Sequence, residues 1–334
     1  MVTIKEIAKE CGYSVTTVSI VLRGDAEKRS ISKETQKAIT EAAQRMGYAP
    51  NVSARRLRSD AAPRKSIAVF WADDFRAVMV AKFLQGVEKY IQDTNADFEI
   101  IVRPYSPNHL KKNATVQNLN MYAGGIICNA SKHDLEYIEG IETLCPIVLY
   151  NRESSRYFNV IVDNHAIGQK AAEVLLQAGC ENMAIITSNK ELTHDAQRIE
   201  GFAKTCLQNK ITSKIIFVDD TTIAEGEKSI DKLPLEEGRL GVFASSDMLA
   251  FGLLKSLNKN GIEIPGQVSL ISVGTSETEI YQCLQPSLSV IEIPIVEMAY
   301  ACMSTMNNAL IQKPFQTRQD EVPFTFLPAK STQV

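Results

Sequence analysis

A run of hydroxyl-bearing and apolar residues near the N-terminus has the composition of a surface that contacts nucleic acid. If the run is helical, Thr16, Ser19 and Ile20 lie on the side opposite Val18 and Leu22. Hydroxyl groups bond phosphate oxygens or base edges, and an isoleucine in the major groove contacts the methyl group of thymine. The run therefore predicts a DNA-reading surface. The alternative is that Ile20 is an ordinary exposed apolar residue.

Polar side chains also gather where apolar runs end in the larger part of the chain. Asp73 and Asp74 follow one run, Asn129 follows a second, and Asn151 and Asp247 follow two more. Open parallel sheets bind ligands at the carboxyl ends of their strands. Carboxylates and amides bond the hydroxyl groups of a sugar or nucleoside, and an arginine can clamp them or an anion. These positions therefore predict a small-molecule site.

No spacing of residues indicates catalysis, a cofactor or a bound metal. The seven cysteines include no Cys-x-x-Cys pair, and the four histidines are scattered, so no metal-ligand spacing is present. The first expected strand–helix turn, Phe-Trp-Ala-Asp-Asp-Phe-Arg, has no glycine-rich phosphate loop of the kind found in a sugar kinase or dehydrogenase. We expect no enzyme, and we expect buried, reduced thiols. The histidines are assigned no chemistry: His109, His133, His165 and His194.

Two short helices joined by a turn are expected to carry the DNA-reading residues. In the first helix, apolar residues recur at the spacing of one buried face: Ile4, Ile7, Ala8 and Cys11. Gly12 suits a tight turn, and Ser14 is placed to cap a second helix that buries Val18 and Leu22. This arrangement is a helix-turn-helix, whose second helix fits the major groove.

A third helix and a short basic helix are expected to follow. Ser32 can cap the third helix and Gly47 can end it, which completes a three-helix core. Pro50 and Asn51 then begin a helix of about two turns, which is marginal alone because helix nucleation is costly. Its arginines suit phosphate groups: Arg55, Arg56 and Arg58.

The headpiece formed by these helices resembles the LacI/GalR family of bacterial repressors, and the similarity runs along most of the chain. The helix-turn-helix and the stretch Pro-Asn-x-x-Ala-x-x-Leu at 50–57 lie at the separation typical of that family. The resemblance implies that a hinge helix orders on operator DNA, with Leu57 wedged into the minor groove beside Asn51 and Ala54. The alternative is that Leu57 is a linker residue. The predicted DNA contacts are Thr3, Ser14, Val15, Thr16, Thr17, Ser19, Ile20, Asn51, Ala54, Arg55 and Leu57.

Two stretches depart from the pattern of the family. Many members carry a guanine-reading arginine at the position of Ile20, so we expect this chain to read thymine methyl groups and DNA shape. Members often show Gly-Phe-Asp-Asp after the strand that matches 268–271, where this chain has Ser272-Val273-Gly274-Thr275. Because the usual acidic group is missing, the ligand is expected to differ from a common hexose, to be phosphorylated, or to be absent.

The resemblance also implies which residues touch an effector, and these match Asn151, Arg198 and Asp247. Ordinary structural roles stay open, since Asp247 can cap a helix over 248–260 and Arg198 can be a surface charge. Asp73 and Asp74 can be loop residues in contact with water. For Asp163 and Asn164, at the start of another helix, capping is expected. The predicted effector contacts are Asp73, Asp74, Asn129, Asn151, Arg198 and Asp247.

The distribution of charge separates the headpiece from the rest of the chain. The net charge is −3, but residues 1–66 hold 13 Lys and Arg against 7 Asp and Glu, a net charge of +6, and the remainder carries −9. A basic headpiece on an acidic body is typical of a specific DNA-binding protein. No apolar signal segment starts the chain and no apolar run approaches about 18 residues, so a cytoplasmic protein without a membrane span is expected.

Strands that alternate with helices after residue 66 predict parallel sheets covered on both faces. About ten strands exceed one typical sheet, which predicts two doubly wound lobes. The resemblance implies a periplasmic-binding-protein-like body, whose chain crosses between lobes near 160, 290 and 322, with ligand between them. The predicted parts are an all-α headpiece over 1–58 with its hinge helix at about 51–58, a linker over 59–66, and an α/β effector-binding and dimerisation domain over 67–334, with an N-lobe (67–160 and 291–321) and a C-lobe (161–290 and 322–334).

Together these features predict a transcriptional regulator, expected to be a repressor, that binds near-palindromic operator DNA as a homodimer or tetramer. A small metabolite, such as a sugar or sugar derivative, is expected to control it, with no cofactor. One alternative is a DNA-binding regulator whose body only dimerises. Another is a sugar-binding transport receptor, which would need a signal peptide and no headpiece, the reverse of what the chain shows.

Overall fold

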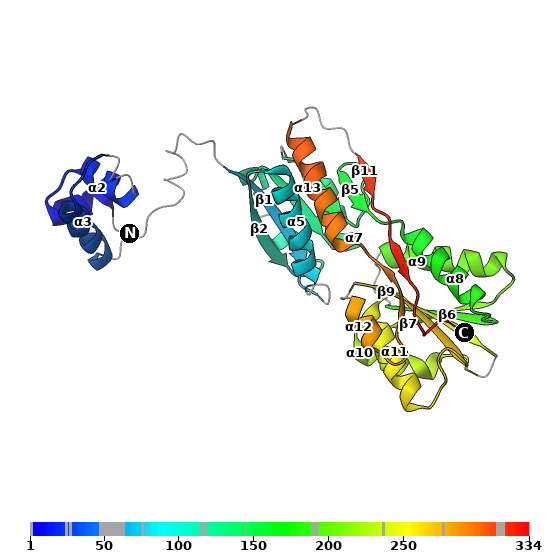
Figure 1. Ribbon diagram of the computed structural model, residues 1–334. Helices are drawn as coiled ribbons and strands as arrows, with labels where there is room; N and C mark the ends of the chain where they lie inside the picture. The colour runs from blue at the N-terminus through cyan, green and yellow to red at the C-terminus, as the bar shows by residue number, and fades with distance from the viewer. Residues whose placement is uncertain are drawn as a thin grey trace. The chain divides into compact units, whose positions relative to one another are not determined.

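A computed structural model describes most of the chain, which forms two compact units, Met1–Arg64 and Lys65–Val334 (Figure 1). The described residues are 3–23, 26, 29–46, 64–74, 77, 79–113, 116, 119–143, 145–188, 193–235, 238–275, 278–311 and 318–333. Within the described ranges, every helix is too short or too polar to cross a membrane.

The headpiece contains three helices: α1 (Ile4–Cys11), α2 (Val15–Arg23) and α3 (Lys33–Arg45). Thr3 and Glu6 form a capping box at the start of α1, and Gly12 ends this helix with a φ of 73°. Ser14 Oγ accepts a hydrogen bond of 3.0 Å from the backbone N–H of Thr17, which confirms the predicted cap of α2. The three helices enclose a small core: Ile7, Ala8, Val18, Ile39, Ala42 and Ala43.

The surface of α2 differs in part from the expectation, because Ser19, which was predicted to face outward, is half-buried. Val15 and Thr16 are exposed, but Ile20 is half-buried, so it is not a fully exposed apolar residue. The predicted hinge helix lies outside the described residues, as do its candidate contacts Asn51, Ala54, Arg55 and Leu57.

The N-lobe of the body is built on a six-stranded parallel sheet in the order β11-β5-β4-β3-β1-β2. Its strands are β1 (Lys65–Ala72), β2 (Phe98–Tyr105), β3 (Gly124–Cys128), β4 (Ile147–Tyr150), β5 (Phe158–Ile161) and β11 (Gln319–Glu321). Strand β1 is apolar throughout its buried part because both of its faces are covered. Ile67, Val69 and Trp71 pack in one core, whereas Ala68 and Phe70 pack in another.

Helices cover both faces of this sheet. They are α5 (Val80–Thr94), α7 (Lys132–Gly140), α13 (Ile295–Ile311) and the short 3-10 helices η2 (Leu110–Lys112) and η3 (Leu119–Met121). Figure 1 shows α5 and α13 side by side, and Gly86 of α5 allows this approach because an added Cβ would clash with the carbonyl oxygen of Val296.

The C-lobe has a second six-stranded sheet in the order β12-β10-β9-β8-β6-β7, in which β12 alone runs antiparallel to its neighbour. Its strands are β6 (Asn182–Ser188), β7 (Ser213–Val218), β8 (Leu240–Ala244), β9 (Val268–Gly274), β10 (Ser289–Glu292) and β12 (Thr325–Leu327). Its helices are α8 (Asn164–Gln177), α9 (Thr193–Gln208), α10 (Ile223–Lys228), α11 (Asp247–Lys259), α12 (Thr278–Cys283) and the 3-10 helix η4 (Ser229–Lys232). The predicted fold class, a helix-turn-helix headpiece with two parallel-sheet α/β lobes, is confirmed.

Some details of the sequence-based expectation are wrong. A six-residue helix, α12, follows β9, where no helix was expected. Gln319–Glu321 forms a strand of the N-lobe, and the last strand of the C-lobe begins only at Thr325. The cysteines are free, but Cys283 is exposed and Cys11 is half-buried, so the thiols are not all buried.

The chain passes between the two lobes three times: after β5, after β10 and after β11. The carboxyl ends of the parallel strands of both sheets therefore lie near the segments that join the lobes.

Candidate functional site

A cavity with an empty volume of about 590 Å³, including solvent at its mouth, lies between the two lobes. The N-lobe contributes Met79, Asn129, Tyr150, Asn151 and Arg152. The C-lobe contributes His194, Asp195, Arg198, Thr221, Ser245, Ser246, Asp247, Val273 and Thr275. The joining segment contributes Ile293, and Ile295 lines the cavity from the start of α13.

Two asparagines occupy equivalent places at the N-lobe edge of the cavity. Asn129 directly follows β3 and Asn151 directly follows β4, with φ values of 61° and 52°. Asparagine adopts this left-handed conformation more readily than most residues, so each strand can turn sharply here. Asn151 Oδ1 accepts a hydrogen bond of 3.4 Å from Asn164 Nδ2, which connects the N-lobe to the start of α8.

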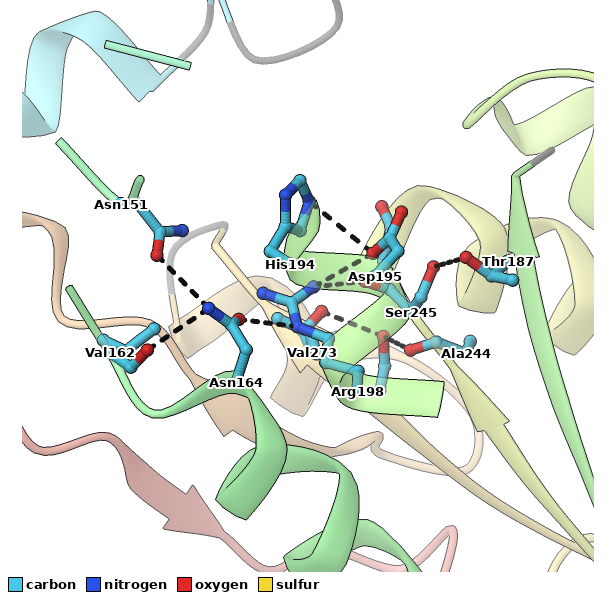
Figure 2. A network of polar contacts seen from close by, with 12 residues as sticks. Asn151, Val162, Asn164, Thr187, His194, Asp195, Arg198, Ala244, Ser245 and Val273 are labelled. Atoms are coloured by element: carbon cyan, nitrogen blue, oxygen red, sulfur yellow. Dashed lines mark hydrogen bonds and ion pairs between the residues drawn. The ribbon is translucent and has the colours of Figure 1, made fainter. Parts of the chain in front are cut away.

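Arg198 is the central cation of the C-lobe side (Figure 2). Its side chain is buried, so the alternative that it is a surface charge is wrong. Nε donates to Asn164 Oδ1 at 3.0 Å and Nη1 donates to the carbonyl oxygen of Ser245 at 3.1 Å. Burial lowers the pKa of Arg198, and the neighbouring Asp195 carboxylate opposes this shift. Because arginine loses its proton only at very alkaline pH, the guanidinium remains a cation.

The close crossing of α8 and α9 positions this arginine. A Cβ atom added at Gly168 would overlap the carbonyl oxygen of Arg198, and one added at Gly201 would overlap that of His165. Only glycines allow the two helix backbones to touch at this point. The crossing therefore holds Arg198 beside Asn164, which follows the cap residue Asp163.

Asp247 begins α11 and is buried, but its carboxylate is turned into the protein. Oδ1 accepts from the Met248 N–H at 3.0 Å and the Ser246 hydroxyl at 3.4 Å. Oδ2 accepts from the Thr275 N–H at 3.0 Å, the Thr275 hydroxyl at 3.2 Å and the Tyr281 hydroxyl at 2.9 Å. Ser246 is the cap residue of α11, and Asp247 joins this helix to α12 and the preceding loop.

His194 and Asp195, in the first turn of α9, belong to the site although the sequence analysis assigned them no role. Asp195 Oδ1 lies 3.5 Å from His194 Nε2 and 3.6 Å from Arg198 Nη1. The spacing of Asp195 and Arg198, i and i+3 on one helix, was the available signal.

On the N-lobe side, Tyr150, the last residue of β4, and Arg152, two residues further on, also line the cavity, although neither was among the predicted effector contacts. Arg152 donates to the carbonyl oxygens of Ala130 and Asn151. Tyr150 packs against Phe83, with ring centroids 5.3 Å apart.

The structure brings four of the six predicted effector residues into one cavity: Asn129, Asn151, Arg198 and Asp247. Asp73 and Asp74 do not line it. Asp73 is exposed, and its backbone N–H continues the pairing of β1 with β2 by donating to the Tyr105 carbonyl oxygen at 2.8 Å. Asp163 caps α8 as expected, by accepting from the Ala166 N–H at 2.8 Å, whereas Asn164 bridges Asn151 and Arg198.

The headpiece presents the other predicted surface. Val15, Thr16 and the capping residue Ser14 are exposed, whereas Thr17 and Ser19 are half-buried. The Thr3 hydroxyl is engaged with Glu6 in the cap of α1, and its backbone N–H also donates to Glu6, which lowers the pKa of that carboxyl group. Among the described residues of both units, no three His, Cys, Asp or Glu side chains gather in a way that could hold a metal ion.

Two family models match the chain. Residues 3–51 match the bacterial regulatory proteins of the lacI family, and residues 172–332 match the periplasmic binding protein-like domain. The ribose operon repressor of Halalkalibacterium halodurans is 27% identical over 342 residues, which cover 100% of this chain and 98% of that protein.

Solved structures of the same architecture are also similar. A LacI family transcription regulator from Clostridium acetobutylicum superimposes with a TM-score of 0.71 at 26% identity, covering 79% of this chain and 98% of that one. The lac repressor dimer bound to operator and an anti-inducer has a TM-score of 0.71 at 17% identity, covering 100% and 99% of the two chains, and shows the shared fold. These proteins are transcription regulators and not enzymes. The chain thus carries a lacI-family DNA-binding domain and a periplasmic-binding-protein-like domain, and its relatives are transcriptional regulators of the LacI/GalR family.

Proposed function

We propose that this regulator represses transcription by binding operator DNA as a homodimer, and that a small molecule in the interlobe cavity changes its DNA affinity. The observation that carries the effector part is the buried guanidinium of Arg198, which faces a cavity lined by both lobes. A ligand that contacts both lobes favours one arrangement of the lobes over another, and only such differential binding can shift an equilibrium.

The DNA part of the proposal is supported by the outward face of α2 and by charge. Thr16 and Val15 are exposed on a helix of the size that enters the major groove. The lac repressor, which shares the fold, is a dimer on its operator. In this chain, Leu57 is proposed as the minor-groove wedge, and a symmetric dimer would match a near-palindromic site. We also propose a cytoplasmic location, because a transcriptional regulator acts where the chromosome is.

A sugar or sugar derivative is the proposed effector class. The name of the ribose operon repressor points to a sugar-linked relative. Asn129, Asn151 and Ser245 supply neutral polar groups around the cavity, and Tyr150 supplies an aromatic wall. To move operator occupancy from about 99:1 to 1:99, the effector must favour one state by about 5.5 kcal/mol.

The operator test begins with selection of binding sites from random duplex DNA, followed by fluorescence anisotropy with the selected site and a scrambled duplex. Leu57→Ala should weaken operator binding at least about tenfold and leave scrambled-duplex binding nearly unchanged, because the wedge acts on a specifically bent site. Leu207→Ala, at a surface leucine of α9, is the matched control and should change neither affinity. An equal loss on both duplexes would contradict the wedge, and no sequence preference would contradict operator binding.

The effector test adds sugars and sugar derivatives to the preformed operator complex. Release or tightening of the complex by a compound that also raises the melting temperature of the protein supports the proposal. If no compound of this class changes operator affinity, while the protein still binds its operator as a dimer, the body only dimerises.

A further inference from the structure

One carboxylate oxygen at the start of α9 faces two basic side chains. Asp195 Oδ1 lies 3.5 Å from His194 Nε2 and 3.6 Å from Arg198 Nη1. The three residues are at least 92% buried. The one negative charge of Asp195 therefore interacts with both the permanent cation of Arg198 and the imidazole of His194. Electrostatic interactions in such buried surroundings are stronger than in water.

The second carboxylate of the cavity is already occupied. The two oxygens of Asp247 accept from five donors, which belong to Ser246, Met248, Thr275 and Tyr281. A carboxylate has about four lone-pair sites. A neutral sugar that used Asp247 to bind its hydroxyl groups would have to displace one of these internal bonds, so this cavity is poorly suited to hydroxyl groups at that corner.

Charged groups from other elements face the same space. Arg152 approaches from the segment between β4 and β5, and Asp247 approaches from α11. Among the described lining residues, three side chains are basic and two are acidic. When His194 is protonated, the lining carries one net positive charge.

We propose that the effector is an anionic small molecule whose carboxylate or phosphate group binds between Arg198 and His194. This inference rests on the proposed function, in which the interlobe cavity is the effector site. Arg198 Nη2 makes no hydrogen bond to any described residue, so it can donate to an anion. Guanidinium–carboxylate and guanidinium–phosphate bonds are charge-assisted and stronger than bonds between neutral groups.

Binding of an anion beside His194 also favours the protonated imidazole, so the complex takes up a proton. Histidine is the side chain whose charge ordinarily changes between pH 5 and 8. The affinity for an acidic sugar should therefore rise as the pH falls from 8 to 6, by up to about tenfold per pH unit for one proton. The affinity for the corresponding neutral sugar should not depend on pH in this range.

Isothermal titration calorimetry on the full chain tests the ligand class with pairs that differ in one group: glucuronate and glucose, galacturonate and galactose, and ribose 5-phosphate and ribose. In at least one pair, the acid should bind at least about tenfold more tightly than its neutral partner. Comparing the affinities of the two sugar acids with that of ribose 5-phosphate shows whether the site prefers a carboxylate or a phosphate group. Arg198→Gln should abolish this preference, whereas Lys204→Gln, at an exposed position of α9, should keep it.

The pH series uses the wild-type protein with the sugar acid that binds, so it does not depend on the folding of a variant. His194→Gln should flatten the pH dependence, and His133→Gln, at an exposed position of α7, should leave it intact. Equal affinity within every pair, or an acid affinity that does not change with pH, would overturn the inference. Failure of every acid and of inorganic phosphate to bind at about 10 mM would overturn it as well. A neutral sugar that binds and changes operator affinity would leave the proposed function standing and this inference wrong.

Discussion

The C-lobe contains two helix pairs that are built alike but present their charges differently. In α8–α9, Gly168 and Gly201 allow the backbones to touch, and in α10–α11, Gly226 and Gly252 do the same. The first pair holds Arg198 with part of its guanidinium available to the cavity. The second pair holds Asp247, but this carboxylate is covered by donors from α12 and the loop before it. This difference indicates that hydrogen-bond donors from the segment after a helix pair determine whether its buried charge is available to a ligand.

The largest effect is expected from filling either helix crossing. Gly201→Ala and Gly252→Ala should each lower the free energy of unfolding by about 3 kcal/mol, because the new methyl group meets a backbone carbonyl that can move only with its helix. Urea unfolding measures the change. Gly140→Ala is the control, since an added Cβ there meets nothing within 4 Å, and it should cause no loss. Wild-type stability in either crossing variant would mean that its helices do not touch.

A smaller effect is expected from removing one of the hydrogen bonds that cover the carboxylate of Asp247. Tyr281→Phe removes the 2.9 Å hydrogen bond to Asp247 and should lower the free energy of unfolding by about 2 kcal/mol, the usual range for a bond to a charged group. Tyr300→Phe is a matched control, since the Tyr300 hydroxyl bonds none of the described residues. In the same variant, the freed acceptor of Asp247 should improve binding of neutral sugars relative to their acids. If the ratio of neutral-sugar affinity to acid affinity does not change, the hydrogen bonds to Asp247 do not determine ligand preference.

The smallest effect concerns one cysteine near each helix pair. Burial raises the pKa of Cys206, on α9, to about 11, so at pH 8 this thiol remains protonated and unreactive. Cys283, the last residue of α12, is exposed and should react first with a disulfide reagent. Cys283→Ser should remove the fastest phase of thiol modification and change the free energy of unfolding by less than about 0.5 kcal/mol. A fast phase that survives this substitution would mean that a buried thiol becomes accessible.

The architecture of both units could be predicted because its signals are local. The spacing of Ile7 and Ala8 and the cap at Ser14 lie within a few residues of the helices they define. Buried parallel strands such as β1 are continuous apolar runs. β11 could not be predicted in this way, because Gln319-Asp320-Glu321 has no apolar pattern and becomes a strand only by pairing with β5.

The site was predicted only in part, because long-range contacts decide which polar strand ends matter. Asn129 and Asn151 follow strands that end at the cavity, whereas Asp73 continues the pairing of its strand with β2. The cover on Asp247 depends on Tyr281, which is 34 residues further along the chain. The place of His194 depends on the crossing of α8 and α9, which is visible only when both helices are seen together.

The final stretch of the chain has a consequence for biosynthesis. Gln319–Glu321 completes the edge of one sheet, Thr325–Leu327 completes the edge of the other, and the buried Ser331 bonds Leu270 and Ser289. A nascent polypeptide that has not yet left the ribosome as far as residue 331 therefore carries two unfinished sheets. Both halves of the body are therefore completed only late in translation, and a premature stop codon near residue 318 would remove an edge strand from each.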